Sequence, residues 1–139
     1  MTAIDSLNAA VPATNEWIDD LMRRLDWHDR ERVCLALLAA LHALRDCLGR
    51  DEAVYVGAHL PPLLRGLYYE GWHPSGRAAT KSRNAFLERI QDGMHRDPAV
   101  DAEQVARAVL ALLAARLPAA ELEDAKAATP KPLHNLWPS

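Results

Sequence analysis

The chain has 139 residues and a mass of 15.4 kDa, the usual size of one domain, and it can bury roughly two thirds of its unfolded surface. Half of the residues are hydrophobic, 25% are charged and 6% are aromatic, which excludes disordered, collagen-like and cysteine-stapled chains. The formal charge of −3 provides no overall attraction for nucleic acid or an anionic membrane, so neither is expected as a partner.

Several features predict a soluble protein of the cytoplasm. Residues 1–17 lack the basic and apolar regions of a secretory signal, and the longest apolar run, residues 33–44, is too short to span a bilayer. Cys34 and Cys47 lie in one predicted helix, roughly 20 Å and about 220° apart, which excludes a disulfide between them. Two thiols outside any metal-binding pattern are typical of a reducing compartment.

Alanine and leucine dominate the chain and no segment alternates with period two, which predicts an all-α fold. Asp29, Asp51 and Asp101 are expected N-caps, while Gly49 and Pro118 are expected to end helices. The expected helices cover approximately residues 16–25, 30–48, 52–59, 62–70, 83–94, 102–117, 121–128 and 130–137.

A shift of 69 residues, without a gap, superimposes one half of the chain on the other. The matched positions are those that helix periodicity places inside: Trp17 with Phe86, Ile18 with Leu87, Leu21 with Ile90, Leu25 with Met94, Leu41 with Leu110, Leu44 with Leu113, Leu48 with Leu117, Leu64 with Leu133, Leu67 with Leu136 and Tyr68 with Trp137. We therefore predict a tandem repeat of two three-to-four-helix units packed into one compact helical bundle domain. Its parts are an N-terminal tail (1–16), a first repeat (17–72), a linker (73–83) and a second repeat (84–139).

Three strings carry a family resemblance: LHALRDCL at 41–48, LPPLLRGLYYEGWHPSG at 60–76 and FLERI at 86–90. Together they resemble the bacterial family called domain of unknown function 2267, whose members join an LRxRL-type helix to an LPxLLRGxYYxGWxP segment. The resemblance covers about residues 17–137, although Cys47 stands where arginine is common and HNLW at 134–137 replaces an RGLYY equivalent. It implies a small, soluble, helical bacterial protein and no assigned reaction.

Motifs for catalysis or cofactor binding are absent from the sequence, which has no glycine-rich phosphate loop, GxSxG, HExxH or EF-hand pattern. We therefore expect no catalytic residue, no cofactor and no metal, and favour a protein that is not an enzyme. His42 and Asp46 come nearest to a metal-binding pair, but an ordinary contact on the helix surface is the favoured interpretation. The linker cations Arg77, Lys81 and Arg83 could bind phosphate, but without interleaved aromatics a solvated loop is favoured.

The candidate ligand- or partner-binding residues are Arg65, Tyr69, Trp72 and His73. They lie in a segment rich in aromatic residues and, unlike the apolar residues beside them, do not recur in the second half. A planar arginine beside aromatic rings suits an anionic or planar partner. The alternative is structural: Tyr69 and Trp72 cover the junction between the repeats, while Arg65 pairs with an acid such as Glu70.

Two functions remain open at this point. The favoured one is a non-catalytic protein-interaction or self-association module, because a repeat architecture without catalytic motifs is typical of such modules. The alternative is a small-ligand-binding protein, conceivably enzymatic, with a cleft at the repeat junction. The four candidate residues would line that cleft, with His59 as a further candidate.

Overall fold

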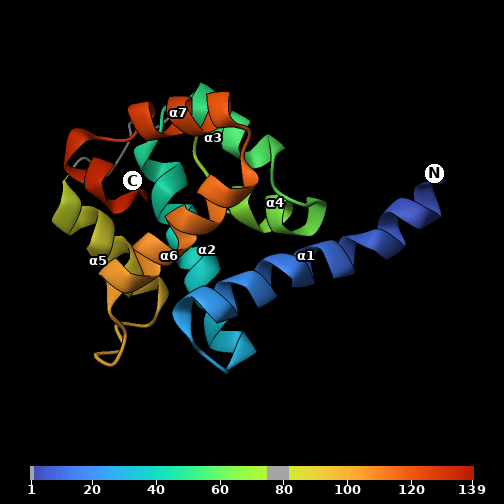
Figure 1. Ribbon diagram of the computed structural model, residues 1–139, viewed down its shortest axis with the longest axis horizontal. Helices are drawn as coiled ribbons and strands as arrows, with labels where there is room; N and C mark the ends of the chain where they lie inside the picture. The colour runs from blue at the N-terminus through green and yellow to red at the C-terminus, as the bar shows by residue number, and fades with distance from the viewer. Residues whose placement is uncertain (1, 75–81) are drawn as a thin grey trace.

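A computed structural model describes residues 2–74 and 82–139, and within these ranges all regular structure is helical (Figure 1). The prediction of an all-α fold is therefore confirmed. Part of the predicted linker, including Arg77 and Lys81, lies outside the described residues. The elements are α1 (Ala3–Leu25), α2 (Arg30–Cys47), α3 (Arg50–Ala58), α4 (Pro62–Tyr69), α5 (Arg83–Gly93), α6 (Ala102–Arg116), α7 (Ala119–Ala128) and a 3₁₀ helix, η1 (Lys131–Leu136).

Side-chain caps determine where several helices begin. The Asp29 carboxylate accepts hydrogen bonds from two backbone amides at the start of α2, and Asp101 does the same for α6. The Ser82 hydroxyl accepts a bond from the third residue of α5. The expected cap at Asp51 is wrong, because Gly49 takes the N-cap position and α3 already begins at Arg50.

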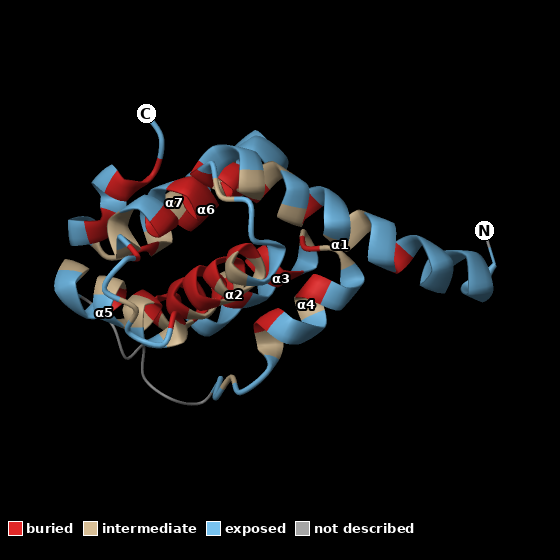
Figure 2. Cartoon of the chain, turned by 90° about the horizontal axis from the view of Figure 1, so that it is seen from below, coloured by how far each residue is buried: buried red, intermediate tan, exposed pale blue. Residues whose placement is uncertain are grey.

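The first helix is longer than predicted. It begins at Ala3 rather than near Glu16, and Thr2 and Asp5 form a reciprocal capping box at its start. The expected tail over residues 1–16 is therefore helical, although Pro12 removes one backbone hydrogen bond within it. Figures 1 and 2 show this part of α1 projecting from the helical body, and within it Ala10 alone is buried.

Two central helices, α2 and α6, carry most of the core (Figure 2). They pack against each other, α1 and α5 each pack against both, and α3 packs against α7. Helix α4 covers α1, α2 and α3, while η1 covers α6 and α7. Ala36, Ala39, Ala40 and Ala43 are buried along α2, where small side chains allow neighbouring helices to approach closely.

A buried cation connects three of these helices. Arg45 on α2 is only 2% exposed, and its guanidinium donates hydrogen bonds to the backbone carbonyls of Tyr68 (2.7 Å) and Glu70 (2.8 Å). It also donates to the carboxylate of Asp46 at 2.8 Å, and that carboxylate accepts a second bond from Arg89 on α5. This network fixes the end of α4 and one side of α5 against α2.

The closest helix contact gives a direct test of the packing. A Cβ atom at Gly93 of α5 would lie 2.5 Å from the Cβ of Ala39 on α2, whereas a Cβ at Gly66 of α4 would meet nothing within 4 Å. We expect Gly93→Ala to reduce the free energy of unfolding by about 1–3 kcal/mol, because α5 must move away from α2. Urea denaturation measures this change.

Gly66→Ala is the matched control for that substitution. Its methyl group meets open space within a helix, so we expect a gain of about 0.5–1 kcal/mol from the better helix propensity of alanine. Equal effects of the two substitutions would contradict the close approach of α5 to α2.

Candidate functional site

The four predicted site residues lie on α4 and directly after it. Arg65, Tyr69 and Trp72 are partly buried, and His73 is exposed. The rings of Tyr69 and Trp72 stack with their centroids 5.4 Å apart. The structure thus brings two of the four together as a ring pair, and a binding role for the group stays a prediction.

Arg65 has a clear structural role. Its Nε donates to the carbonyl of Gly57 at 2.9 Å, and its Nη2 donates to the carbonyls of Leu60 (2.9 Å) and Ala58 (3.3 Å). These carbonyls lie at the C-terminal end of α3, where backbone acceptors have no partner within the helix. The idea that Arg65 pairs with an acid is therefore wrong, since its partners are backbone oxygens.

One of these bonds has a counterpart in the second half of the chain. His134 stands 69 residues after Arg65, and its Nε2 lies 2.7 Å from the carbonyl of Thr129, which stands 69 residues after Leu60. The same acceptor position is thus satisfied by arginine in one half and by histidine in the other. The inference that Arg65 is freed from shared packing does not hold, because its contact recurs with a different donor.

Tyr69 also has a packing role. Its hydroxyl donates to the carbonyl of Val54 at 3.4 Å, and its ring lies directly over Gly57. A Cβ at position 57 would be 2.2 Å from the Tyr69 hydroxyl oxygen, so α3 and α4 can be this close only with glycine there. Among the four predicted residues, Trp72 and His73 therefore have the fewest structural duties.

The role of Arg65 can be tested by stability. We expect Arg65→Ala to reduce the free energy of unfolding by about 1–3 kcal/mol, because carbonyls at the end of α3 lose a charged donor. Chemical denaturation gives the value.

Arg23→Ala is the control for Arg65→Ala. The side chain of Arg23 is 70% exposed and lies 3.9 Å from Asp20, so its loss should change stability by less than about 0.5 kcal/mol. An Arg65→Ala protein as stable as this control would show that the arginine is free for binding.

His42 and Asp46, the nearest approach to a metal-binding pair in the sequence, have other partners. The Nε2 of His42 lies 2.8 Å from the carbonyl of Leu67, and Asp46 pairs with Arg45 and Arg89. Burial lowers the pKa of His42 below its usual 6.5. Nowhere in residues 2–74 and 82–139 do three or more His, Cys, Asp or Glu side chains form a group that could hold a metal ion.

The pKa of His42 predicts a pH dependence of stability. The folded protein holds this imidazole neutral, so it binds fewer protons than the unfolded chain once the pH falls below about 6.5. Its contribution to the free energy of unfolding is present above that pH and is lost as the pH falls through the lowered pKa. We expect His42→Gln to lose less stability than the wild type between about pH 8 and pH 5.

Urea denaturation over this pH range measures the difference. His28→Gln serves as control, because the His28 side chain is 92% exposed. The explanation fails if His42→Gln and His28→Gln follow the same pH dependence as the wild type.

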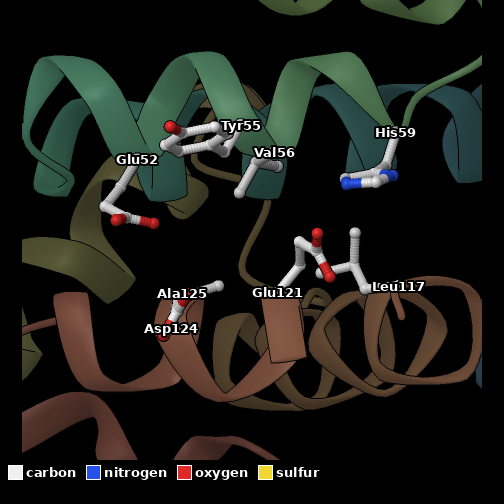
Figure 3. Close-up of a pocket in the computed structure, with 8 residues that line it drawn as sticks. All are labelled: Glu52, Tyr55, Val56, His59, Leu117, Glu121, Asp124 and Ala125. Carbon is white, nitrogen blue, oxygen red and sulfur yellow. The ribbon is translucent and has the colours of Figure 1, made fainter. Parts of the chain in front are cut away.

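A hollow of about 240 Å³ lies between α3 and α7 (Figure 3). Figure 3 shows side chains from the two helices pointing toward one another across it. His59, a candidate lining residue of the predicted cleft, is among them, whereas Arg65, Tyr69, Trp72 and His73 are not. The lining residues are Glu52, Tyr55, Val56, His59, Leu117, Glu121, Asp124 and Ala125.

The hollow combines an apolar floor with an acidic rim. Val56, Leu117 and Ala125 are buried. Glu52 and Glu121, together with Asp124, carry carboxylates that form no ion pair or hydrogen bond with any residue that the structure describes. Sequence reasoning missed this site because Glu52 resembles an ordinary acid at a helix start. The 69-residue offset contained a signal, since it relates Glu52 to Glu121 and Val56 to Ala125.

The fold and these surfaces define a small all-helical protein, and within the described ranges no helix combines the length and apolarity needed to cross a membrane. The chain belongs to a family of uncharacterised conserved proteins, DUF2267, whose profile matches residues 14–136. The match confirms the resemblance carried by the three strings, and its first residue lies within α1. No curated protein matches the chain.

Proposed function

We propose that the protein is a non-catalytic interaction module that associates with a second copy of itself through residues 3–16 of α1, which we name the α1 arm. The observation that carries this proposal is an apolar stripe on the arm, where Ile4, Leu7 and Val11 are 64%, 69% and 56% exposed. Apolar side chains at this spacing share one side of a helix. Such a stripe on a projecting helix is typical of a contact surface.

The arm needs a partner for a physical reason. Helices of this length are marginal in water when they stand alone, and most helical stability in proteins comes from packing of an apolar face. The arm projects from the body, with Ala10 as its one buried residue (Figure 2). Burial of the stripe against another surface would supply the missing packing.

A second copy fits the chemistry of the arm. Asp5 is the only charged residue between Ala3 and Asn15, so two arms can pair without strong repulsion. A two-fold contact between antiparallel arms also keeps the two Asp5 side chains at opposite ends. Leu63 and Leu67 on α4, which packs against α1, are 45% and 39% exposed and could extend the apolar contact.

We also infer that the body is an internal duplication with an offset of 69 residues. Cys47 and Arg116 end α2 and α6 at this offset, and Arg50 and Ala119 begin α3 and α7 at the same offset. The packing of α1 on α6 corresponds to that of α5 on α2. Burial supports the inference too, since each pair is buried on both sides: Trp17 and Phe86, Leu21 and Ile90, Leu25 and Met94, Leu41 and Leu110, Leu44 and Leu113, Leu48 and Leu117, Leu64 and Leu133, and Tyr68 and Trp137.

The cytoplasm remains the proposed location. Both cysteines are free, and burial raises the pKa of the Cys47 thiol to about 12, which makes it unreactive. Nucleic acid is not a proposed partner, because the net charge is −3 and Arg83 is already bonded to Glu103 and Asn135.

A second candidate function is small-ligand binding. The observation that favours it is the hollow between α3 and α7, which joins the two proposed repeats and includes His59. This function uses a different surface from the α1 arm, so either can hold without the other.

Self-association through the arm predicts a concentration-dependent dimer. The double substitution Leu7→Glu with Val11→Glu places carboxylates in the apolar stripe. We expect it to raise the dimer dissociation constant by at least about tenfold, which corresponds to about 1.4 kcal/mol. Sedimentation velocity over a concentration series measures this constant.

Ala9→Glu is the control, because position 9 lies on the opposite side of the exposed arm. It should leave the dissociation constant within about twofold of the wild type. A wild-type protein that stays monomeric at every concentration, or a control as disruptive as the double variant, would contradict the proposal.

A further inference from the structure

We propose that the hollow between α3 and α7 binds a small organic cation, namely an ammonium or guanidinium ion attached to a short apolar chain. This inference rests on the second candidate function, since it names the class of ligand for that hollow. It is independent of association through the α1 arm.

The size and floor of the hollow set the first requirement. Its volume of about 240 Å³ is below the usual range for drug-sized ligands, so a small molecule fits best. Val56, Leu117 and Ala125 are 2%, 7% and 2% exposed and offer apolar surface to a short hydrocarbon chain. The ligand is therefore expected to be partly apolar.

The charge of the rim sets the second requirement. Glu52, Glu121 and Asp124 come from two helices, and no lysine or arginine in the described part of the chain lines the hollow. Carboxylates elsewhere on this protein are often paired, for example Asp20 with Arg116 and Asp97 with Arg32. Three carboxylates without such a partner around one cavity favour a cation and disfavour an anion.

Helix dipoles explain only part of this rim. Acids in the first turn of a helix are favourable wherever they point, and Glu52 and Glu121 lie in the first turns of α3 and α7. However, Asp51 already provides an acid in the first turn of α3 and does not line the hollow. Asp124 lies beyond the first turn of α7, where the effect has faded. The orientation of all three toward one cavity thus needs another reason.

Two further side chains suit an organic cation. The Tyr55 side chain belongs to a residue that is 60% exposed, and it presents an aromatic ring to the hollow, where a cation can contact the ring face (Figure 3). At the other end His59 carries ring nitrogens, one of which can accept a hydrogen bond when the imidazole is neutral. An ammonium group has three donors to share among such acceptors.

A single metal ion fits this cavity less well. Within residues 2–74 and 82–139, no three His, Cys, Asp or Glu side chains form a group that could hold one ion. The rim acids are therefore too dispersed for inner-sphere coordination by one small ion. A larger cation that interacts with several carboxylates around an apolar chain matches their arrangement.

The probes for the test are n-butylamine, 1-butanol and butyrate, which have similar chains but carry a positive charge, no charge and a negative charge. Each is titrated into ¹⁵N-labelled protein, and the amide signals of Val56 and Ala125 are followed. We expect n-butylammonium to bind in the millimolar range, as its few heavy atoms allow, and at least about tenfold more tightly than the other two. Added salt should weaken its binding.

Matched variants locate the charge effect. Glu121→Gln and Asp124→Asn should each raise the dissociation constant of n-butylammonium about three- to fivefold. Glu123→Gln is the control on the same helix, because Glu123 does not line the hollow and its side chain is 74% exposed. It should change the constant by less than about twofold. Thermal unfolding establishes that each variant is folded, and the comparison of the three probes on the wild type decides the matter if one is not.

The outcomes separate this inference from the function on which it rests. Equal binding of 1-butanol or butyrate at Val56 and Ala125 would keep ligand binding but overturn the choice of a cation. Displacement of n-butylammonium by millimolar Mg²⁺ at the same signals would assign the hollow to a metal ion and also overturn it. Absence of binding by all three probes would remove both the inference and the second candidate function.

Discussion

The buried guanidinium of Arg45 is the interaction on which the arrangement of the first four helices depends. A charge that is only 2% exposed is tolerable when its hydrogen-bond donors find acceptors, and here the carbonyls of Tyr68 and Glu70 and the carboxylate of Asp46 provide them. Two of these acceptors lie at the end of α4, where backbone oxygens have no partner within the helix. The same contact therefore satisfies the arginine, ends α4 and holds that helix on α2.

The candidate hollow follows from this network in two further steps. Once α4 is held on α2, Arg65 and Tyr69 on α4 fix α3, because Arg65 binds carbonyls at the end of α3 and Tyr69 lies against Gly57. Helix α3 then faces α7 across the acidic rim (Figure 3). The residues that sequence reasoning singled out for binding thus include two that build one wall of the hollow without lining it.

What could be predicted from the sequence depended on whether a signal was local. Asp29 and Asp101 cap their helices through neighbouring amides, so the start of α2 and of α6 could be predicted from adjacent residues. The capping box of Thr2 and Asp5 was equally local but was overlooked, because the exposed segment after it contains Pro12 and little core pattern. The role of Arg65 was out of reach for another reason. A comparison of residue types finds no match between arginine and histidine, although Arg65 and His134 bind carbonyls at related positions.

The α1 arm and the hollow are separate surfaces with opposite chemistry. The arm is apolar and almost uncharged, whereas the rim of the hollow carries three carboxylates, so a partner that suits one surface is poorly matched to the other. Pairing of two arms would bury apolar area on α1 and leave the acidic rim in water. Figure 1 shows the arm projecting on one side of the body while α3 and α7 lie together away from it. Both α2 and α4 pack against α1 and also against α3, so any coupling between the two surfaces has to pass through these helices. Because α2 is the packed centre of the fold and α4 is a single short helix with one exposed face, α4 is the element whose movement would connect them at the lower energetic cost.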